Sequence, residues 1–125
     1  MKAPVTAALW GLLATAPAMA HHSFAAFDLK KTVVLDGKLT EVRLTNPHSF
    51  FIVEVAGKDG QAPVSWTIEG VSPGQLFAKG LKRSALKAGD HVTLTANPLR
   101  SGEIGGSLVS LKLADGTIIE GGPGQ

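Results

Sequence analysis

Histidines are the residues of this sequence whose positions point most clearly to chemistry. His21 and His22 are adjacent, His48 ends the segment Thr45-Asn46-Pro47-His48, and His91 lies further along. If the chain is cleaved before His21, the free α-amine and the imidazole Nδ1 of that residue close one chelate ring on a metal ion. A third nitrogen from His48 completes a T-shaped, all-nitrogen site, which suits Cu(II) best. The sequence therefore predicts copper as a cofactor, held by His21 and His48.

Two further side chains belong to this predicted metal site. His22 offers a second binding mode through the amine, the first amide and its own imidazole. Glu69 has the outward phase of a predicted strand, where its carboxylate could accept a hydrogen bond from an imidazole N–H. Each residue also has a simpler interpretation: a solvated His-His tail, a His48 that only braces its turn, and a solvated Glu69. His91 is expected on the outer face, apart from the site.

The first twenty residues have the pattern of a secretory signal peptide. Lys2 supplies a basic start, residues 5–16 are apolar and free of acidic side chains, and Ala18-Met19-Ala20 is a small-x-small cleavage site. The apolar run is too short for a membrane span. We therefore expect cleavage after Ala20 and export to the periplasm.

Alternating apolar and polar residues predict a chain made mostly of strands. A helix is expected between the third and fourth strands, because Ser72-Pro73 is a typical helix start and Gly80 a typical helix end. In the first strand the apolar phase changes, which requires a bulge or bend at Gly37 or at Thr40-Glu41. The expected strands cover residues 33–45, 50–55, 64–69, 91–96 and 108–113, with a short sixth at 117–120.

This order of elements predicts an all-β fold, a five-stranded barrel of the oligonucleotide/oligosaccharide-binding (OB) type with its helix between strands three and four. A small open sandwich is the alternative. The domain should span residues 21–120, followed by a flexible tail at 121–125. Residues 101–106 are expected to form a mobile loop.

Aromatic residues divide into core and docking roles. Trp66 and Phe77 are expected in the core. Phe24 and Phe27 are expected to dock the N-terminal segment on the barrel, which would hold His21 and His22 near one place. Of Phe50 and Phe51, one should point inward.

Composition narrows the function classes. The 125 residues contain no cysteine, which excludes a disulfide scaffold and a thiolate metal site, and the formal net charge of +2 creates no strong nucleic-acid-binding field. The chain has no Gly-x-Ser-x-Gly nucleophile motif and no phosphate-binding loop. An interaction module that binds a peptide, glycan or envelope protein is the alternative to a metal-binding protein. An enzyme such as a copper oxidase ranks last, because no second catalytic group is identified.

Several motifs together resemble a known group of sequences. These are the start His21-His22-Ser23-Phe24, the turn Asn46-Pro47-His48, the strand Trp66-Thr67-Ile68-Glu69-Gly70 and the turn Leu86-Lys87-Ala88-Gly89-Asp90. In them the chain resembles a family of short exported proteobacterial proteins of unknown function. The resemblance covers essentially everything after residue 20 and implies an exported, small β-barrel-like domain, with no assigned activity. Members of the family have His-Pro after the fourth strand where this chain has Asn97-Pro98, so we assign no ligand there.

Overall fold

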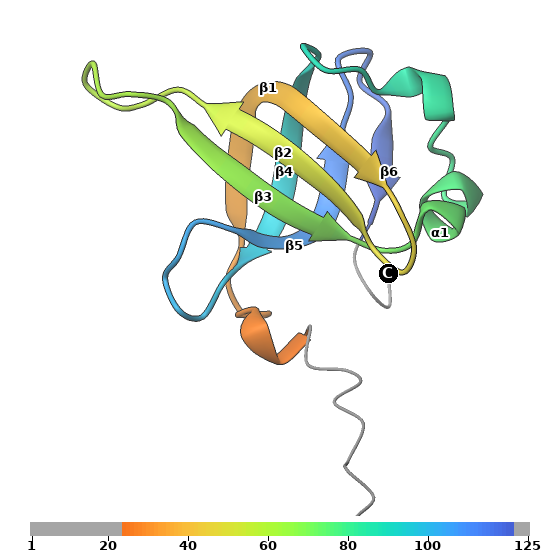
Figure 1. Ribbon diagram of the computed structural model, residues 1–125, viewed down its shortest axis with the longest axis horizontal. Coiled ribbons are helices and arrows are strands. Elements are labelled where there is room, and N and C mark those ends of the chain that lie inside the picture. The colour runs from red at the N-terminus through yellow and green to blue at the C-terminus, as the bar shows by residue number, and fades with distance from the viewer. Residues whose placement is uncertain (1–23, 122–125) are drawn as a thin grey trace, which may run out of the picture.

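The computed structural model describes residues 24–121 and shows a mainly β domain with one short α-helix (Figure 1). The predicted signal peptide and most of the predicted C-terminal tail lie outside these residues. The elements in chain order are η1 (Phe24–Ala26), β1 (Val33–Leu44), β2 (Ser49–Val55), β3 (Val64–Gly70), α1 (Pro73–Ala78), η2 (Arg83–Ala85), β4 (His91–Pro98), β5 (Gly106–Lys112) and β6 (Ile118–Glu120).

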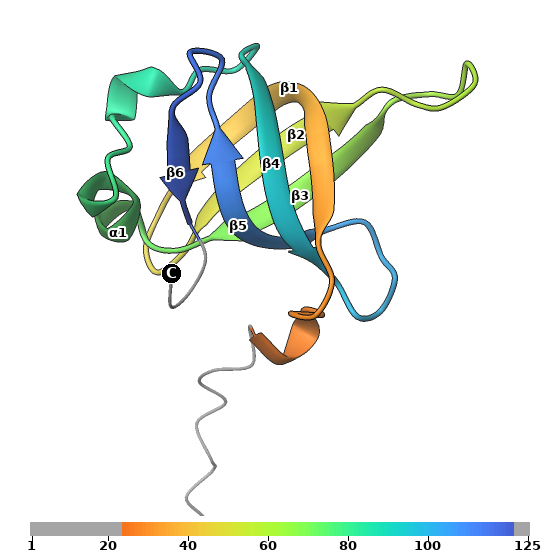
Figure 2. The same cartoon turned by 180° about the vertical axis from the view of Figure 1, so that it is seen from behind.

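The strands form one sheet that closes on itself. Their order is β3-β2-β1-β4-β5-β6, and an additional parallel pairing of β3 with β5 joins the two sides. Figure 2 shows β1 and β4 in front of β2 and β3, with β5 crossing beneath them. The predicted OB-like, five-stranded barrel is therefore confirmed over the open sandwich, with α1 between β3 and β4 and with the short sixth strand.

The first strand bends so that it serves both halves of the barrel. Its first half, from Val33 to Lys38, pairs with β4, and its second half, from Lys38 to Leu44, pairs with β2. The register shifts between Leu39 and Glu41, as expected of a bulge. Both predicted positions, Gly37 and Thr40-Glu41, contribute to the bend. At Gly37 the strands approach so closely that a Cβ atom would lie only 2.3 Å from the backbone oxygen of Glu54.

The predicted mobile loop at 101–106 is wrong at its C-terminal end. Gly106 is the first residue of β5, is buried, and pairs with both Ile68 of β3 and Pro98 of β4. A Cβ atom at Gly106 would lie 2.7 Å from the backbone oxygen of Asn97. Glycine at this position therefore permits the close approach of strands that closes the barrel.

The helix that precedes β4 has the predicted capping. The Ser72 hydroxyl accepts the backbone N–H of Gln75, whose side chain in turn accepts from the Ser72 backbone, a complete capping box. Pro73 occupies the first turn, and Gly80 follows the C-cap with a φ of +101°. Across residues 24–121, no helix has the length and apolar content that a membrane crossing requires.

The barrel encloses one hydrophobic core that draws on every strand. Phe51 points inward and is fully buried, while Phe50 lies on the outer side and is half-buried, as expected for neighbours in a strand. Trp66 and Phe77 pack against the core but are only partly buried, so they form its margin rather than its centre. The fully buried large apolar side chains are Leu39, Phe51, Val53, Ile68, Leu76, Val92, Leu94, Leu108, Leu111 and Ile119.

Candidate metal-binding site

His48 follows the turn between β1 and β2 and contacts a carboxylate on the neighbouring strand. Its Nδ1 atom lies 2.6 Å from Oε1 of Glu69 in β3. Both side chains are accessible, with 36% of His48 and 24% of Glu69 exposed. The Thr45 hydroxyl donates to the backbone oxygen of His48 at 3.0 Å and so closes the turn. The structure thus brings together two of the four residues predicted for the metal site.

The register of the β2–β3 hairpin explains this contact. Phe50 is paired with Glu69, which brings Glu69 beside the start of β2, two residues after His48. The register is already set at the hairpin turn, where the Gln61 N–H donates to the Lys58 backbone oxygen and the two residues between them have positive φ. Counting outward from the pair Lys58–Gln61 gives the observed partners. The contact can therefore be derived from the sequence, because Asp59-Gly60 is typical of a two-residue hairpin turn and such a turn fixes the register.

The pairing with Glu69 occupies one ring nitrogen of His48 and leaves the other available. A carboxylate at Nδ1 selects the imidazole tautomer that carries its proton on Nδ1, and this leaves the lone pair of Nε2 free. Metal-binding histidines in proteins commonly donate their second ring N–H to such a carboxylate, which fixes the ring and raises its basicity. Glu69 thus contacts an imidazole nitrogen, and its role beside a metal ion stays a prediction.

The N-terminal segment is attached to the same end of the barrel. Phe27 is 5% exposed and forms an isolated antiparallel bridge with Leu99, in the connection after β4. Backbone bonds flank this bridge, from the Asp28 N–H to the Pro98 oxygen and from the Arg100 N–H to the Ala26 oxygen, both at 2.8 Å. The prediction that Phe27 docks this segment is confirmed, whereas the Phe24 side chain lies outside the described part of the structure.

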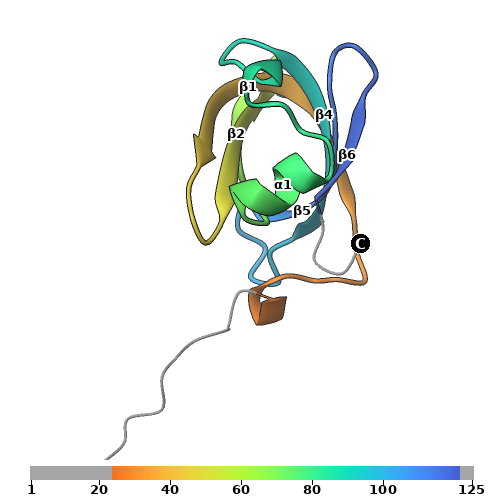
Figure 3. The same cartoon turned by 90° about the vertical axis from the view of Figure 1, so that its right-hand side faces the viewer.

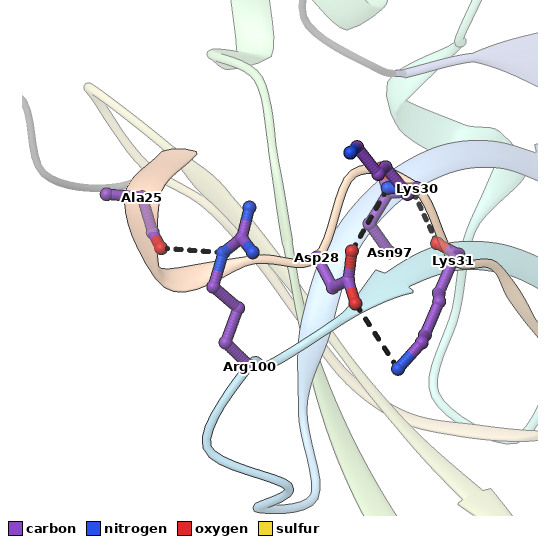
Figure 4. Close-up of polar contacts among 6 residues, drawn as sticks. All are labelled: Ala25, Asp28, Lys30, Lys31, Asn97 and Arg100. Atoms are coloured by element: carbon purple, nitrogen blue, oxygen red, sulfur yellow. Dashed lines mark hydrogen bonds and ion pairs between the residues drawn. The ribbon is translucent and has the colours of Figure 1, made fainter.

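Polar contacts hold the segment on both sides of Phe27 (Figure 4). The Arg100 guanidinium donates to the backbone oxygen of Ala25, and the Asn97 amide donates to that of Lys31. Asp28 accepts the backbone N–H of Lys30 and pairs with the Lys31 ammonium. The Lys30 N–H, followed by Lys31, holds the pKa of the Asp28 carboxyl below its ordinary value.

Glu69 and Phe27 line one hollow. This hollow has a volume of about 170 Å³ and is bounded further by Thr67 and by the β4–β5 connection through Leu99, Ile104, Gly105 and Gly106. The residue that anchors the N-terminal segment therefore shares a cavity with the carboxylate that contacts His48. In Figures 1, 2 and 3 alike, η1 and the β1–β2 turn lie at the same end of the barrel.

His91, the other histidine among the described residues, does not join this pair. His21 and His22 lie outside the described residues. His91 is 62% exposed on β4, as predicted, and its Nε2 contacts Asp36 of β1, a pairing that required the β1–β4 register and was not predicted. Between residues 24 and 121, no three His, Asp or Glu side chains are grouped closely enough to hold a metal ion. The described residues thus provide two separate imidazole–carboxylate pairs, of which His48 with Glu69 is the one at the predicted site.

Comparisons with known proteins identify a family but no function. No curated protein and no solved structure matches the chain. A family model described as a family of unknown function, DUF6152, matches residues 11–108. Since that match covers most of the 125 residues and every element from η1 to the start of β5, the protein belongs to this family of unknown function.

Proposed function

We propose that the protein is an exported, periplasmic copper-binding protein whose site forms when cleavage after Ala20 exposes His21 as the N-terminus. The His21 amine and imidazole supply two nitrogens, and Nε2 of His48 supplies the third. Glu69 orients His48 from outside the coordination shell, and His22 provides the alternative mode. An all-nitrogen, near-planar donor set of this kind favours Cu(II).

The observation that carries the proposal is the 2.6 Å contact between His48 Nδ1 and Glu69 Oε1. The contact directs the metal-binding nitrogen, Nε2, away from the carboxylate. A histidine that merely braced a turn would not need a carboxylate partner from the neighbouring strand. The half-exposed state of both side chains also leaves the site open to a metal ion.

The anchoring of Phe27 supports the participation of His21. Phe27 lines the same hollow as Glu69, so the chain is attached beside the candidate ligand. His21 lies three positions before Phe24, and an extended chain of that length reaches about 10 Å. The attachment therefore limits the volume that the amine and imidazole of His21 can explore, which lowers the entropic cost of forming a two-segment site.

The proposal is tested by copper titration of three proteins that differ at the two segments. The first begins at His21, the second begins at Ser23 and so lacks both His21 and His22, and the third has His48→Ala. We expect the first to bind one Cu(II) with nitrogen hyperfine structure in its electron paramagnetic resonance spectrum. The other two should bind more weakly by orders of magnitude, because each has lost a ligand.

His91→Ala is the matched control, since it removes an exposed histidine that contacts a different carboxylate. Its copper affinity should equal that of the parent. If His48→Ala binds copper as tightly as the parent, the two-segment site is wrong, and binding belongs to the His21-His22 pair alone. Intact-mass measurement of the exported protein tests the processing separately, and a first residue other than His21 contradicts it.

A further inference from the structure

The crossover from β3 to β4 concentrates positive charge. Residues 70–89 contain four basic side chains, Lys79, Lys82, Arg83 and Lys87, and no acidic one. The chain has 12 basic and 10 acidic residues in all, so eight basic and ten acidic residues remain outside the crossover. A nearly neutral protein is therefore divided into a cationic crossover and a remainder with a slight negative excess.

The fold presents this charge to solvent. Lys82, Arg83 and Lys87 are exposed on η2 and its flanks, and none of them forms an ion pair with any residue in the described range 24–121. Two carboxylates flank these cations: the Lys87 backbone N–H donates to Asp90 Oδ2 at 2.9 Å, and the pKa of Asp115 is lowered mainly by the Thr117 backbone N–H and only last by Lys82. In Figure 3 the crossover, with α1, faces the viewer. Lys82, Arg83 and Lys87 are thus available to an external anion.

Apolar side chains accompany these cations. Phe77 on α1 is half-buried, and the Arg83 guanidinium lies 5.2 Å from the centre of its ring. Leu86, between Arg83 and Lys87, is also partly exposed. We refer to the surface formed by Phe77, Lys82, Arg83, Leu86 and Lys87 as the crossover patch.

We propose that the crossover patch docks the protein on an anionic lipid surface through the phosphate groups of the lipids. Clusters of Lys and Arg next to apolar side chains are attracted to such surfaces, and each cation adds to the attraction. A nucleic acid is a poorer fit. Its tight binding requires more phosphate contacts than three or four cations supply, and stacking requires an open aromatic face, whereas Phe77 lies beneath Arg83. This inference does not depend on the copper site.

Vesicle sedimentation of the protein as isolated after export tests the patch. We expect binding to vesicles that contain phosphatidylglycerol, no binding to pure phosphatidylcholine vesicles, and loss of binding as salt is raised. The variant Lys82→Gln, Arg83→Gln, Lys87→Gln should reduce the partition coefficient about a hundredfold, since each cation contributes roughly a factor of five. Its melting temperature should match that of the parent, and so should its copper affinity.

The control variant is Lys38→Gln, Lys58→Gln, Lys112→Gln, which removes the same charge from exposed positions on β1, the β2–β3 turn and β5. It should keep most of the binding. Equal loss in both variants, or no binding of the parent to anionic vesicles, overturns the proposal. A parent that binds a single-stranded oligonucleotide through the patch but ignores vesicles also overturns it and favours a nucleic acid partner.

Discussion

Nδ1 of His48 and Oε1 of Glu69 lie 2.6 Å apart, joining the β1–β2 turn to the outer side of β3. The two residues are brought together by the β2–β3 ladder, in which Phe50 faces Glu69. A turn histidine alone would sample several orientations. The Glu69 carboxylate restricts the orientation of the His48 ring, and the backbone of β3 restricts the position of Glu69.

Glu69→Gln tests whether this orientation matters for metal binding. The amide keeps the shape of the side chain but removes its charge, so the hydrogen bond that orients the His48 ring is weakened. We expect the Cu(II) affinity of the protein that begins at His21 to fall by about 10- to 100-fold. Isothermal titration with copper measures this. Asp36→Asn removes the carboxylate beside His91 and should leave the affinity unchanged.

Phe27→Ala tests the attachment of the N-terminal segment. Loss of a buried phenylalanine commonly costs about 3–5 kcal/mol, and here the loss should act first on the segment, because Phe27 lies at the edge of the barrel rather than inside it. The amides of Asp28 and Arg100, which bond across the bridge, should exchange with solvent at least about tenfold faster.

Residue-resolved hydrogen exchange measures the faster exchange expected in Phe27→Ala. Arg100→Ala is the control variant that should disturb the attachment less. It removes only the side-chain bond to Ala25 and keeps the backbone bond to Ala26. Copper affinity should fall in Phe27→Ala. Unchanged exchange at Asp28 would show that Phe27 is not the anchor.

The sequence was most informative where its signals were local. Period-two alternation predicted the strands and most of the core, because each strand has one face against the barrel interior. Capping residues predicted α1, and the phase change in β1 predicted its bend. The identity of Phe51 as the inward residue also follows from alternation alone.

Relationships across the barrel were less accessible from the sequence. The contact of His91 with Asp36 depends on the β1–β4 register, which no short turn fixes. The role of Gly106 appears only when β3 and β5 meet, because a glycine-rich segment has the same composition in a loop and at a close strand contact. Trp66 has the inward phase of its strand, yet it is only partly buried and packs against the margin of the core.

Gly37→Ala should destabilise the protein strongly. The added Cβ atom would lie 2.3 Å from the Glu54 oxygen and 3.3 Å from the Val55 Cα, so backbone must move at the bend of β1. We expect a loss of about 2–3 kcal/mol in the free energy of unfolding, measured by urea denaturation. Gly74→Ala in α1 is the control, because nothing lies within 4 Å of its added Cβ. It should be neutral or stabilising by up to about 1 kcal/mol.

Ser49→Ala should not weaken the protein, although Ser49 is fully buried. Its hydroxyl oxygen has no hydrogen-bond partner within residues 24–121, so removing it relieves a buried polar group. We expect a gain of between zero and about 1 kcal/mol. Asn97→Ala is the contrast, because the Asn97 amide donates to the Lys31 oxygen at 2.7 Å. It should cost about 1–3 kcal/mol, and a similar loss in Ser49→Ala would indicate that the hydroxyl is bonded.

Acidification should separate the docking of the N-terminal segment from copper binding. The pKa of Asp28 is lowered in the folded protein, first by the Lys30 backbone N–H and then by Lys31. Its charged form therefore favours the docked segment above the ordinary carboxyl pKa of 3.8, and this contribution is lost as pH falls through the lower folded value. Exchange at the Arg100 amide, corrected for its intrinsic pH dependence, should indicate the same docking at pH 8 and pH 5 and weaker docking below about pH 4. Asp28→Asn should remove that change.

As the pH is lowered, copper should be released at a higher pH than the one at which the N-terminal segment undocks. An imidazole or α-amine binds metal only after losing its proton, and such groups ordinarily have pKa values of about 6.5 and 7.7–8.0. We therefore expect much of the Cu(II) to be released by about pH 5 while the segment is still docked. Copper titrations at pH 7.5 and pH 5, run beside the exchange measurement, test this order of events. Retention of full copper affinity at pH 5 would point to carboxylate ligands, and undocking at pH 5 would show that groups other than Asp28 control the segment.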